Sequence, residues 1–596
     1  MDEKPSSDIY WEYTNGLENF LKLHSYPPIT WISLNKSQED KSFEDRILSV
    51  ANLGCQGYIV ATPRVKDFIT LKYNVTQKSI LHRRNDYFIF LLDDQDGSLT
   101  QEILHHSAMK LYPSHLIVRN SKNGTFDLIT QKFVSNFNNE EGMLLDILQK
   151  DGSLKENAAI FPDKLNNLQG RDIPMGTHTY LPYSVIQKAP YNGNKGNVDE
   201  LGEDQPKTLF IDGTEAIMVI EFSRLKNFTM KFKMFGIEEF GSIYANGTGE
   251  GILGNIYLKN IDFGFGCTSL WYYELLDYSH VNAASTVVLI IPAAKMLPPA
   301  IAPLLPFTWK VWLGITLTIL IDILVYYWLG WHSLKESGKE SSWSSAMLIV
   351  GGIYLQQCIP DTKKDSSVRG LVAILLVSSL VLGNSYGGAL SSVLTVPSYE
   401  DSVDTVRKIV DKGYKWGGPS LAWVNTIMRA EDPDYQALIK NFEVHPVEKL
   451  RELSFRHDYG LAFEKTTSGR YAFGPHIKLD VLDHFELFKK FLFFEWSTPN
   501  AVRGWPLMEY FNKHLLEVLQ HGLFDFWERR STAKYFDVTT ELVLQHIASG
   551  HHMNPGVIEL QVSHISGALF VLAMGLLIAF LVFLVELLAF HYHKRH

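Results

Sequence analysis

The sequence contains few cysteines and no surplus of basic residues. Only three cysteines stand among its 596 residues, which excludes the disulfide-dense class of small secreted scaffolds. Lysine and arginine total 55 against 65 aspartates and glutamates, so nucleic acid is a poor partner for a chain of net charge −10. Aromatic residues make up 13% of the chain, which excludes low-complexity disorder. These values leave a large folded protein.

Motifs for catalysis and for metal binding give no coherent site. There is no Walker A loop and no H-E-x-x-H motif. His551, His552 and the histidines of the C-terminal tail lack partners at the spacing of metal ligands. We therefore expect no catalytic residues, no metal site, no cofactor and no enzyme activity.

Long apolar runs occur in only two parts of the chain. A membrane span needs ~20 mostly apolar residues, because a helix rises ~1.5 Å per residue through a hydrocarbon core of ~30 Å. Three segments meet this requirement: Val311–Trp331, Gly370–Val396 and Gly567–Phe590. A fourth run, Met347–Leu355, lies between two of them and is too short to cross. It fits either a re-entrant segment that lines a pore or a linker on the membrane surface.

Basic residues and glycosylation sequons indicate the topology. The connections at 335–339 and 363–369 and the C-terminal tail carry lysine and arginine, which the positive-inside rule places in the cytoplasm. Residues 1–306 and 398–566 would then lie outside. Five N-x-S/T sequons precede the first span and agree with this: Asn35, Asn74, Asn123, Asn227 and Asn246. The first residues do not form a signal peptide, so either a leader is missing or the N-terminal region is not exported, and we favour the missing leader.

Outside the membrane runs, strand-length apolar segments alternate with helical patterns, as in α/β folds. The runs at 87–93 and 114–119 are examples, with a helical pattern from Gln101 to Leu111 between them, and Pro182-Tyr183 falls in a further strand-like run. One such α/β region precedes the pore block and another follows it. The simplest interpretation is a two-lobed clamp that the membrane segments interrupt.

The order of these parts and several motifs resemble ionotropic glutamate receptors. Gln356-Gln357-Cys358 is similar to the family's Q-Q-G-C at the pore apex. Residues 385–396, SYGGALSSVLTV, match the gate signature S-Y-T-A-N-L-A-A-F-L-T-V without a gap. Leu584-Val585-Glu586 and the YGLAFEKT of 459–466 are similar to further family motifs, and the resemblance covers roughly 166–593.

The resemblance implies the fold class α/β plus membrane α. A bilobed clamp, similar to periplasmic binding proteins, is interrupted by a pore block of two helices and a re-entrant loop, and a third transmembrane helix follows near the C-terminus. The expected parts, in chain order, are an amino-terminal α/β region at 1–165, the first clamp segment at 166–306, a membrane helix at 307–332, the re-entrant loop at 341–358, the pore-lining helix at 369–397, the second clamp segment at 398–560, the last membrane helix at 563–590 and a cytoplasmic tail at 591–596.

The sequence departs from glutamate receptors in the clamp. The family's arginine that grips the ligand carboxylate is replaced by Tyr272, and no lysine or arginine stands between Lys259 and Lys295. An unpaired buried carboxylate is costly, so glutamate is a poor ligand. The acidic residue that holds the ligand amine persists as Glu464. With this pattern the chain resembles arthropod ionotropic receptors of the tuning-subunit type, which implies a heterotetramer with co-receptor subunits.

The candidate site residues follow from this resemblance. Gln356, Gln357 and Asp361 are candidates for the filter, where a neutral amide can replace part of a cation's hydration. The candidates for the gate are Ser385, Tyr386, Gly387, Gly388, Ala389 and Leu390, although small residues also serve ordinary helix packing. Candidates for the ligand cleft are Tyr272, Ser420 and Glu464.

Several of these residues have a plainer interpretation. Glu464 could be a solvated acid at a strand end, and Trp271-Tyr272-Tyr273 could fill the cleft and keep it shut. Asp322, inside the first span, fits a polar contact to another subunit or to the permeation path, or a protonated acid bonded to a neighbouring helix. Cys55 and Cys267 are expected to be single buried thiols.

The function predicted first is a ligand- or stimulus-gated cation channel subunit that depolarises a sensory neuron in chemosensation, thermosensation or hygrosensation. Its location would be the plasma membrane, in a sensory dendrite or cilium. One alternative is a membrane-anchored binding subunit without a pore, and another is a modulatory subunit that contributes no stimulus site.

Overall fold

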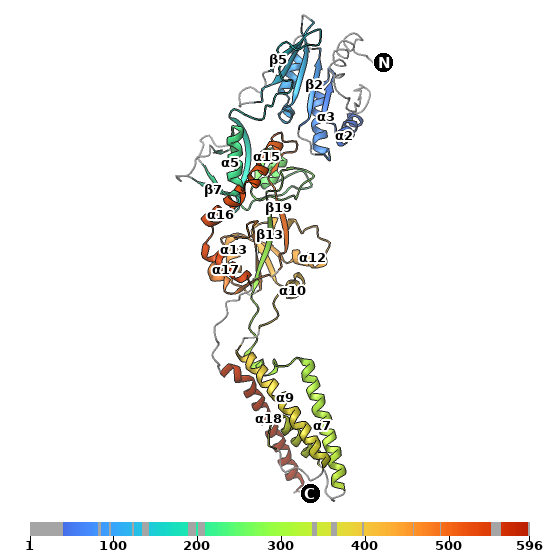
Figure 1. The fold of residues 1–596 in the computed structure, drawn as a ribbon, viewed down its shortest axis with the longest axis vertical. Helices are drawn as coiled ribbons and strands as arrows, with labels where there is room; N and C mark the ends of the chain where they lie inside the picture. Colours follow the sequence, from blue (N-terminus) through green and yellow to red (C-terminus); the bar gives the residue numbers. More distant parts are fainter. Residues whose placement is uncertain are drawn as a thin grey trace. The chain divides into compact units, whose positions relative to one another are not determined.

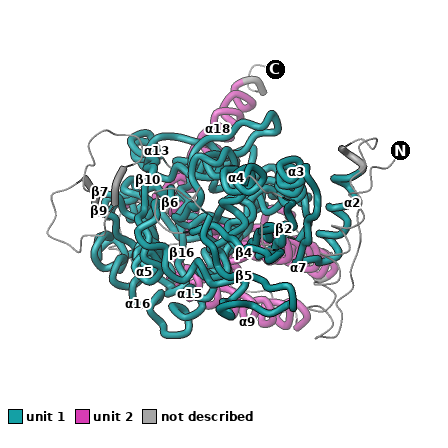
Figure 2. The backbone as a smooth tube through the Cα atoms, turned by 90° about the horizontal axis from the view of Figure 1, so that it is seen from above, with its two compact units in different colours: residues 1–292, 404–550 teal, residues 293–403, 551–596 magenta. Residues whose placement is uncertain are grey.

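The computed structural model describes residues 40–81, 85–93, 97–121, 124–133, 142–188, 198–200, 209–335, 342–358, 366–395, 399–456, 458–488, 490–549 and 562–593. The chain divides into two compact units (Figure 2). The first unit comprises residues 1–292 and 404–550, and the second comprises 293–403 and 551–596.

The amino-terminal part of the first unit is a five-stranded sheet in the order β1-β2-β3-β4-β5. Its first three strands are parallel, and β4 and β5 are antiparallel. The short turn between β3 and β4 explains this change, because a parallel connection needs a crossover of a dozen or more residues. The elements are α2 (Asp40–Asn52), β1 (Gly57–Val60), α3 (Val65–Lys78), β2 (Tyr87–Leu92), α4 (Ser98–His105), η1 (Ser107–Leu111), β3 (His115–Asn120), β4 (Phe126–Gln131) and β5 (Gly142–Leu148).

The first lobe of the clamp contains a six-stranded sheet in the order β12-β20-β11-β6-β10-β8. Helices α5, α15 and α16 pack together against it (Figure 1). The elements are β6 (Arg171–Thr179), β8 (Val198–Glu200), α5 (Thr214–Lys226), β10 (Phe228–Ile237), α6 (Gly251–Tyr257), β11 (Phe263–Phe265), β12 (Asp277–Tyr278), β20 (Asn500–Ala501), α15 (Met508–Gln520) and α16 (Leu523–Tyr535), with β7 (Val185–Lys188) and β9 (Leu209–Asp212) as a separate pair.

The second lobe contains a sheet in the order β15-β14-β16-β13-β18, to which β17 and β19 add at β16 and β13. Its elements are β13 (Ala283–Pro292), α10 (Val406–Asp411), β14 (Lys415–Gly418), α11 (Ala422–Asn425), α12 (Pro433–Lys440), β15 (Phe442–Val444), α13 (Val447–Leu453), β16 (Tyr459–Lys465), β17 (Tyr471–Ala472), α14 (Leu479–Leu482), β18 (Phe485–Leu487), β19 (Phe493–Ser497) and α17 (Val538–Ala548).

Each lobe takes elements from both sides of the membrane segments. Strand β13 precedes these segments in the chain but pairs with β16 and β19 of the second lobe. Strand β20 follows them but pairs with β11 of the first lobe. The chain therefore passes three times between the lobes, from β12 to β13, from β19 to β20 and from α16 to α17, and these passages form the hinge.

The second unit holds the membrane segments. Three of its helices are long and apolar enough to cross a membrane: Trp309–His332, Ser366–Thr395 and Ile565–His591. They lie within α7 (Trp309–Lys335), α9 (Ser366–Thr395) and α18 (Val562–His593). The shorter α8 (Trp343–Tyr354) packs against both α7 and α9, and η2 (Pro299–Leu304) packs against the start of α18.

The short apolar run therefore forms a half-span helix. Its buried residues Ala346, Val350 and Ile353 share one core with residues of α7 and α9. This packing favours the re-entrant interpretation over a linker on the membrane surface.

Candidate ligand cleft and candidate pore

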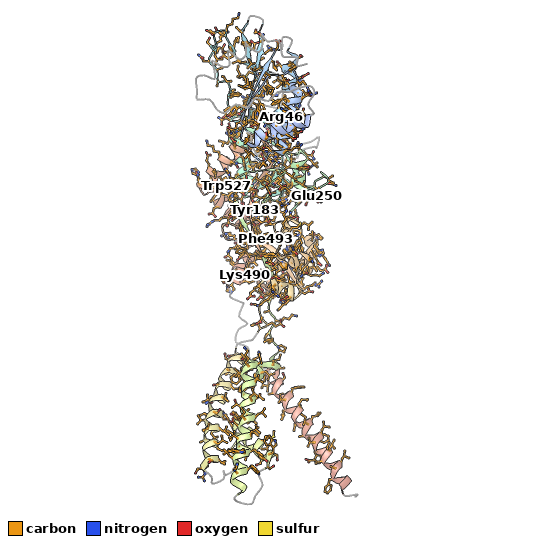
Figure 3. All side chains as sticks on the ribbon, turned by 90° about the vertical axis from the view of Figure 1, so that its right-hand side faces the viewer. Arg46, Tyr183, Glu250, Lys490, Phe493 and Trp527 are labelled. Atoms are coloured by element: carbon orange, nitrogen blue, oxygen red, sulfur yellow. The ribbon has the colours of Figure 1, made fainter. Side chains whose placement is uncertain are left out.

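Glu464 lies between the two lobes and is bonded by both. It stands near the end of β16, opposite Val287 of β13, and only 1% of it is exposed. The Tyr183 hydroxyl donates to Oε1 and the Tyr180 hydroxyl donates to Oε2, each at 2.6 Å. Both tyrosines belong to the first lobe, and Tyr183 (labelled in Figure 3) is fully buried. The interpretation of Glu464 as a solvated acid at a strand end is therefore wrong.

Tyr180 and Tyr183 lie in one turn, which follows β6. Pro182 and Tyr183, which we predict in a strand-like run, follow the end of β6 at Thr179. The Tyr183 amide donates to the Tyr180 carbonyl at 2.9 Å, which closes the turn, and proline has no amide to offer to a sheet. The turn places both hydroxyls on the Glu464 carboxylate.

Burial governs the charge of Glu464. It raises the pKa of this carboxyl from its ordinary 4.5 to about 7, although hydrogen bonds from Ser285, Tyr180 and Tyr183 oppose the increase. Glu238 of the first lobe behaves in the same way, because burial raises its pKa to about 7 against the hydrogen bond from Trp423. The negative charge of Glu464 raises the pKa of Glu238 further.

Aromatic side chains fill the space between the lobes. The Tyr180 ring lies 5.3 Å from that of Phe240 and 6.5 Å from that of Trp423, and the Phe240 ring lies 5.6 Å from that of Trp271. Trp423 of the second lobe donates from Nε1 to Glu238 of the first lobe at 2.9 Å. At the rim, Trp271 Nε1 donates to the Thr426 hydroxyl at 3.0 Å. These contacts favour the cleft-filling interpretation for Trp271.

The other two cleft candidates lie apart from Glu464. Tyr272 is half-buried against the first-lobe core, and its backbone amide donates to the Tyr278 hydroxyl at 3.0 Å. Ser420 lies just before α11, and its hydroxyl accepts from the Ala422 amide at 3.2 Å. Trp416 also lies outside the cleft, because it is fully buried in the second lobe, where Nε1 donates to the Leu438 carbonyl. Among the described residues, no hydrogen bond joins Tyr272 or Ser420 to Glu464.

Glu215 joins two of the passages of the chain between the lobes, those near Asn282 and Ser497. The sequence offers no motif that singles it out. It stands in the first turn of α5 and is fully buried. Oε2 accepts from the Gly266 and Cys267 amides at 2.7 and 3.0 Å. Oε1 accepts from the Asn282 amide group at 2.6 Å and from the Ser497 hydroxyl at 2.9 Å. Asn282 and Ser497 belong to the two passages, so Glu215 holds them together.

The candidate filter lies at the end of α8. Gln356 has a left-handed backbone with φ of 57°, and its amide donates to the Ile353 carbonyl at 2.9 Å. Its side chain is exposed and lies against Gly383 of α9, where any Cβ would meet its Nε2. Gln357 is also exposed. Asp361 lies outside the described residues.

Two hydrogen bonds attach α8 to its neighbours. The Ser379 hydroxyl of α9 donates to the Ile353 carbonyl at 2.6 Å. The Tyr354 hydroxyl donates to Asp322 Oδ2 of α7 at 2.7 Å. The partner of Asp322 is thus a helix of its own chain, as one of the two interpretations of this residue requires.

The candidate gate residues lie in the second half of α9. Tyr386 donates to the Pro303 carbonyl of η2 at 3.0 Å, and its ring lies 5.9 Å from that of Phe307. Ser385, Gly387 and Gly388 are exposed, whereas Ala389 and Leu390 are half-buried. Among the described residues, a Cβ at Gly387 or Gly388 would meet no heavy atom within 4 Å outside its own stretch of helix, so this stretch can pack closely against another helix.

Helix α9 contains a short motif with the spacing of a catalytic serine motif. Residues 383–387, GNSYG, read as G-x-S-x-G, the spacing of a hydrolase nucleophile elbow. That motif requires a sharp turn between a strand and a helix, but Ser385 lies inside the continuous helix α9. The motif therefore carries no nucleophile function.

The cysteines and the sequons fall in different environments. All three cysteines are free: Cys267 is buried, Cys55 is only half-buried and Cys358 is exposed. The expectation of single thiols is confirmed, but the burial of Cys55 is not complete. Asn35 and Asn123 lie outside the described residues, whereas Asn74, Asn227 and Asn246 lie within them.

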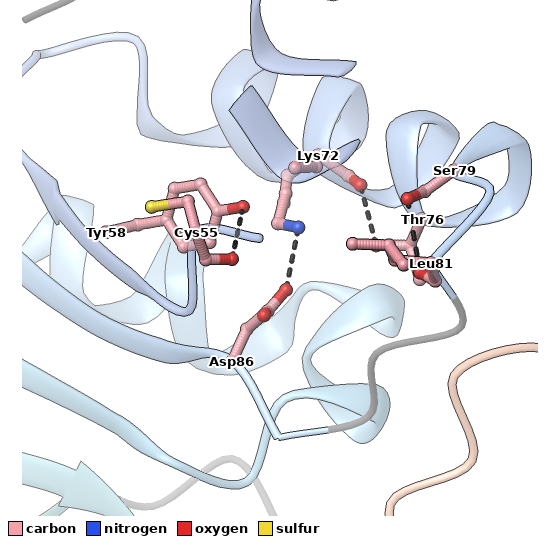
Figure 4. Close-up of a pocket in the computed structure, with 8 residues that line it drawn as sticks. Cys55, Tyr58, Lys72, Thr76, Ser79, Leu81 and Asp86 are labelled. Atoms are coloured by element: carbon pink, nitrogen blue, oxygen red, sulfur yellow. Dashed lines mark hydrogen bonds and ion pairs between the residues drawn. The ribbon is translucent and has the colours of Figure 1, made fainter. Parts of the chain in front are cut away.

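A small pocket lies in the amino-terminal sheet region (Figure 4). Lys72 of α3 and Asp86 form a buried ion pair inside it, with Nζ and Oδ2 2.7 Å apart. The ammonium group also lies 4.5 Å from the centre of the Tyr58 ring. The charge of Lys72 is thus already matched within the protein.

Residues 308–576 match the family model of the ligand-gated ion channel. This segment is similar to the domains of ligand-gated ion channels. The matching model describes a family of channels, not of enzymes. The match begins at the start of α7 and ends inside α18, so it includes the half-span α8 and the second-lobe elements that follow α9.

The chain is also similar to ionotropic glutamate receptors. It is 24% identical over 270 residues to the kainate 4 receptor of Mus musculus, covering 41% of this chain and 28% of the receptor. The kainate 4 receptor of Homo sapiens gives the same values. The delta-2 receptor of Danio rerio is 23% identical over 177 residues, covering 29% of this chain and 18% of that receptor. The matched region thus spans less than a third of each relative.

Proposed function

We propose that this protein is a subunit of a stimulus-gated cation channel in the plasma membrane of a sensory cell, in a dendrite or cilium. It assembles with co-receptor subunits into a heterotetramer and serves chemosensation, thermosensation or hygrosensation. One observation carries the proposal: the half-span α8 is held between α7 and α9 and ends in exposed amide side chains, within the segment that matches ligand-gated ion channels.

The connections between the clamp and the membrane unit supply a mechanism. Strand β13 of the second lobe ends at Pro292, just before the membrane unit begins, and α10 of the same lobe starts at Val406, shortly after α9 ends. Movement of the second lobe toward the first displaces both connections. The displacement pulls on α9 and opens the crossing formed by residues 384–396.

The identity of the permeating ion follows from charge. Gln356 and Gln357 place neutral amides at the end of α8, and an amide oxygen can replace part of the hydration shell of a cation. Asp361, close by in the sequence, adds an acidic group that raises the local cation concentration. Cation influx then depolarises the cell.

A substitution at the end of α8 tests the pore. We expect Gln356→Arg to reduce cation current at least tenfold in cells that express the chain with co-receptor subunits, because a fixed positive charge opposes cations at close range. Whole-cell recording of the stimulus-dependent current measures this. Deletion of 347–357 should abolish the current while the protein still reaches the cell surface.

The matched control is Gln520→Arg, which places the same charge on an exposed position of α15. This variant should conduct as the unchanged chain does. Unchanged permeation in Gln356→Arg would contradict the pore assignment. Surface expression with stimulus binding but no current in any subunit combination would support the alternative of a pore-less binding or modulatory subunit.

A further inference from the structure

The two lobes are joined by side chains of the protein itself. Tyr180 and Tyr183 of the first lobe bond Glu464 of the second, and Trp423 of the second lobe bonds Glu238 of the first. We call these five residues the interlobe latch. Both carboxyl groups are more than nine-tenths buried, so closure of the lobes removes both from water.

Among the residues that the structure describes, the groups named here as facing the latch carry no positive charge. Cys267 Sγ lies 3.9 Å from Glu464 Oε1, and Glu528 of α16 also acts on Glu464. Burial holds the pKa of Tyr180, Tyr183 and Cys267 well above their ordinary values, so all three stay neutral near pH 7. Burial lowers the pKa of His178, whose ring lies 6.1 Å from that of Tyr180, to about 4, so it too is neutral.

Further acidic residues lie near the latch. Glu215 and Glu495 act on Cys267, which lies beside Glu464. Among the described residues, no lysine or arginine forms an ion pair with any of the five buried or half-buried acids of this region, which are Glu215, Glu238, Glu464, Glu495 and Glu528. Two carboxylates brought close together in such a place cannot both ionise without cost.

We propose that closure of the two lobes takes up protons at Glu464 and Glu238, so that acidification closes the clamp. The proposal stands on the hydrogen bonds across the cleft and on the absence of a facing cation. It rests on the proposed function only for the consequence that closure opens a channel. Protons thereby become a stimulus, or a modulator of another stimulus, for this clamp.

The direction of the pH effect on closure follows from the difference in carboxyl pKa between the open and the closed clamp. In the open clamp the carboxyls meet water and titrate near the ordinary 4.5, and in the closed clamp burial raises the pKa of each to about 7. Closure is thus favoured most below about pH 4.5 and loses this contribution as the pH rises through 7. Between these values the closure constant changes by up to ~10-fold per pH unit for each proton taken up, and the interacting pair shares its protons.

The test measures closure directly in the full chain. Spin labels are placed at Asn246→Cys in the first lobe and Glu431→Cys in the second, both exposed positions, with Cys55 and Cys358 changed to serine. Distances between the labels are measured by double electron–electron resonance at pH 5.5, 6.5, 7.5 and 8.5 in lipid nanodiscs. We expect the short-distance population to increase as the pH falls.

Substitution of the two acids tests which carboxyl groups take up the protons. Glu464→Gln and Glu238→Gln each keep an acceptor oxygen but cannot titrate, so each should reduce the pH dependence and the pair together should remove it. Glu541→Gln is the control, because Glu541 is a buried acid of the second lobe that is ion-paired with Arg470. It should leave the pH dependence unchanged.

A distance distribution that is constant from pH 5.5 to 8.5, or that opens on acidification, would overturn the proposal. So would full pH dependence in the Glu464→Gln, Glu238→Gln double variant. Because the readout needs no current, a titrating clamp in a chain that never conducts would refute the channel proposal alone. A conducting chain with a pH-independent clamp would refute this inference alone.

Discussion

At the scale of single residues, the cleft replaces ionic partners by neutral hydrogen-bond donors. Glu464 is bonded by two tyrosine hydroxyls, and among the described residues it forms no ion pair with a lysine or arginine. A neutral donor stabilises an ionised carboxylate less than a cation does, so burial dominates and the carboxyl protonates more readily. We therefore expect the stability of the closed cleft to depend on pH.

Removal of the Tyr183 hydroxyl should destabilise the protein by an amount that depends on pH. In Tyr183→Phe the Oε1 atom of Glu464 loses its tyrosine donor and keeps only the weak Cys267 thiol, which we expect to cost about 1–3 kcal/mol when the carboxyl is ionised. Because burial raises the pKa of Glu464 to about 7, the carboxyl is mostly protonated at pH 5 and mostly ionised at pH 8.5. The variant should thus lose more stability at pH 8.5, as thermal unfolding of the full chain at both pH values would measure.

The control for this prediction is Tyr435→Phe. The Tyr435 hydroxyl donates to the Leu492 backbone carbonyl at 2.9 Å, an acceptor that does not titrate. Its loss should cost the same at both pH values. An equal loss in Tyr183→Phe at both pH values would mean that Glu464 does not change its charge in this range.

The local structure at two of the sequons predicts which asparagine carries a glycan. The Asn246 Oδ1 atom accepts from the Thr248 amide and hydroxyl in an exposed turn. In the Asn74 sequon, by contrast, Thr76 is buried in α3 and bonds the Lys72 carbonyl and the Tyr112 hydroxyl. We expect Asn246→Gln to remove a glycan and Asn74→Gln to leave the glycosylated mass unchanged, as mass spectrometry before and after deglycosylation would record. A glycan on Asn74 but none on Asn246 would contradict this ranking.

At the scale of secondary-structure elements, the local pattern of the sequence predicts where helices and strands form better than it predicts which strands pair. The apolar runs at 87–93 and 114–119 become β2 and β3. The predicted helix from Gln101 to Leu111 is broken at His106, whose ring nitrogen accepts from the Ala108 amide and starts a separate turn. Periodicity is local, whereas the pairing of β13 with β16 joins residues about 180 positions apart and leaves no local signal.

The hinge depends on one side chain of α5. In Glu215→Ala, the buried amides of Gly266 and Cys267 and the side chains of Asn282 and Ser497 lose their acceptor. Unsatisfied buried donors cost about 1–3 kcal/mol each, so we expect a loss of at least about 3 kcal/mol in the free energy of unfolding. Hydrogen exchange should also accelerate at 279–283 and 497–501, where the chain passes between the lobes.

Glu221→Ala is the matched control on the same helix. Glu221 is exposed in part and pairs only with Arg224 three residues away, so its loss should change stability by less than about 0.5 kcal/mol. Exchange in the two passages should stay unchanged. Equal effects of Glu215→Ala and Glu221→Ala would contradict the proposed role of Glu215 in the hinge.

At the scale of the whole molecule, the sequence predicts the fold class and the three membrane helices but not the content of the cleft. The spans follow from composition alone, because ~20 apolar residues have few other stable locations. The filling of the cleft depends on Tyr180, Phe240 and Trp423, which are remote in sequence and meet only after both lobes have formed. Glu238 has no distinguishing pattern in the sequence, and its importance follows only from its contact with Trp423.

Arg503 is one of the residues that join the amino-terminal region to the first lobe, together with the contacts of Asn85 with Glu509 and of Lys259 with Tyr73. The 7%-exposed side chain of Arg503 donates to the Ser79 carbonyl at the end of α3 and to the Glu274 carbonyl in the loop that carries Trp271. Hydrogen bonds from a charged donor contribute about 1.5–3 kcal/mol each. We therefore expect Arg503→Ala to weaken the contact by roughly 3 kcal/mol or more. The amino-terminal region should then melt in its own calorimetric transition, below that of the clamp.

A control distinguishes loss of this contact from general instability. Arg530→Ala removes an exposed arginine from α16 of the same lobe and should leave the calorimetric profile as it was. Hydrogen exchange at 72–79 of α3 and at 270–276 should increase together in Arg503→Ala, because one side chain holds both segments. If only 270–276 responds, Arg503 supports the loop alone, and the amino-terminal region has no direct mechanical connection to the rim of the cleft through this residue.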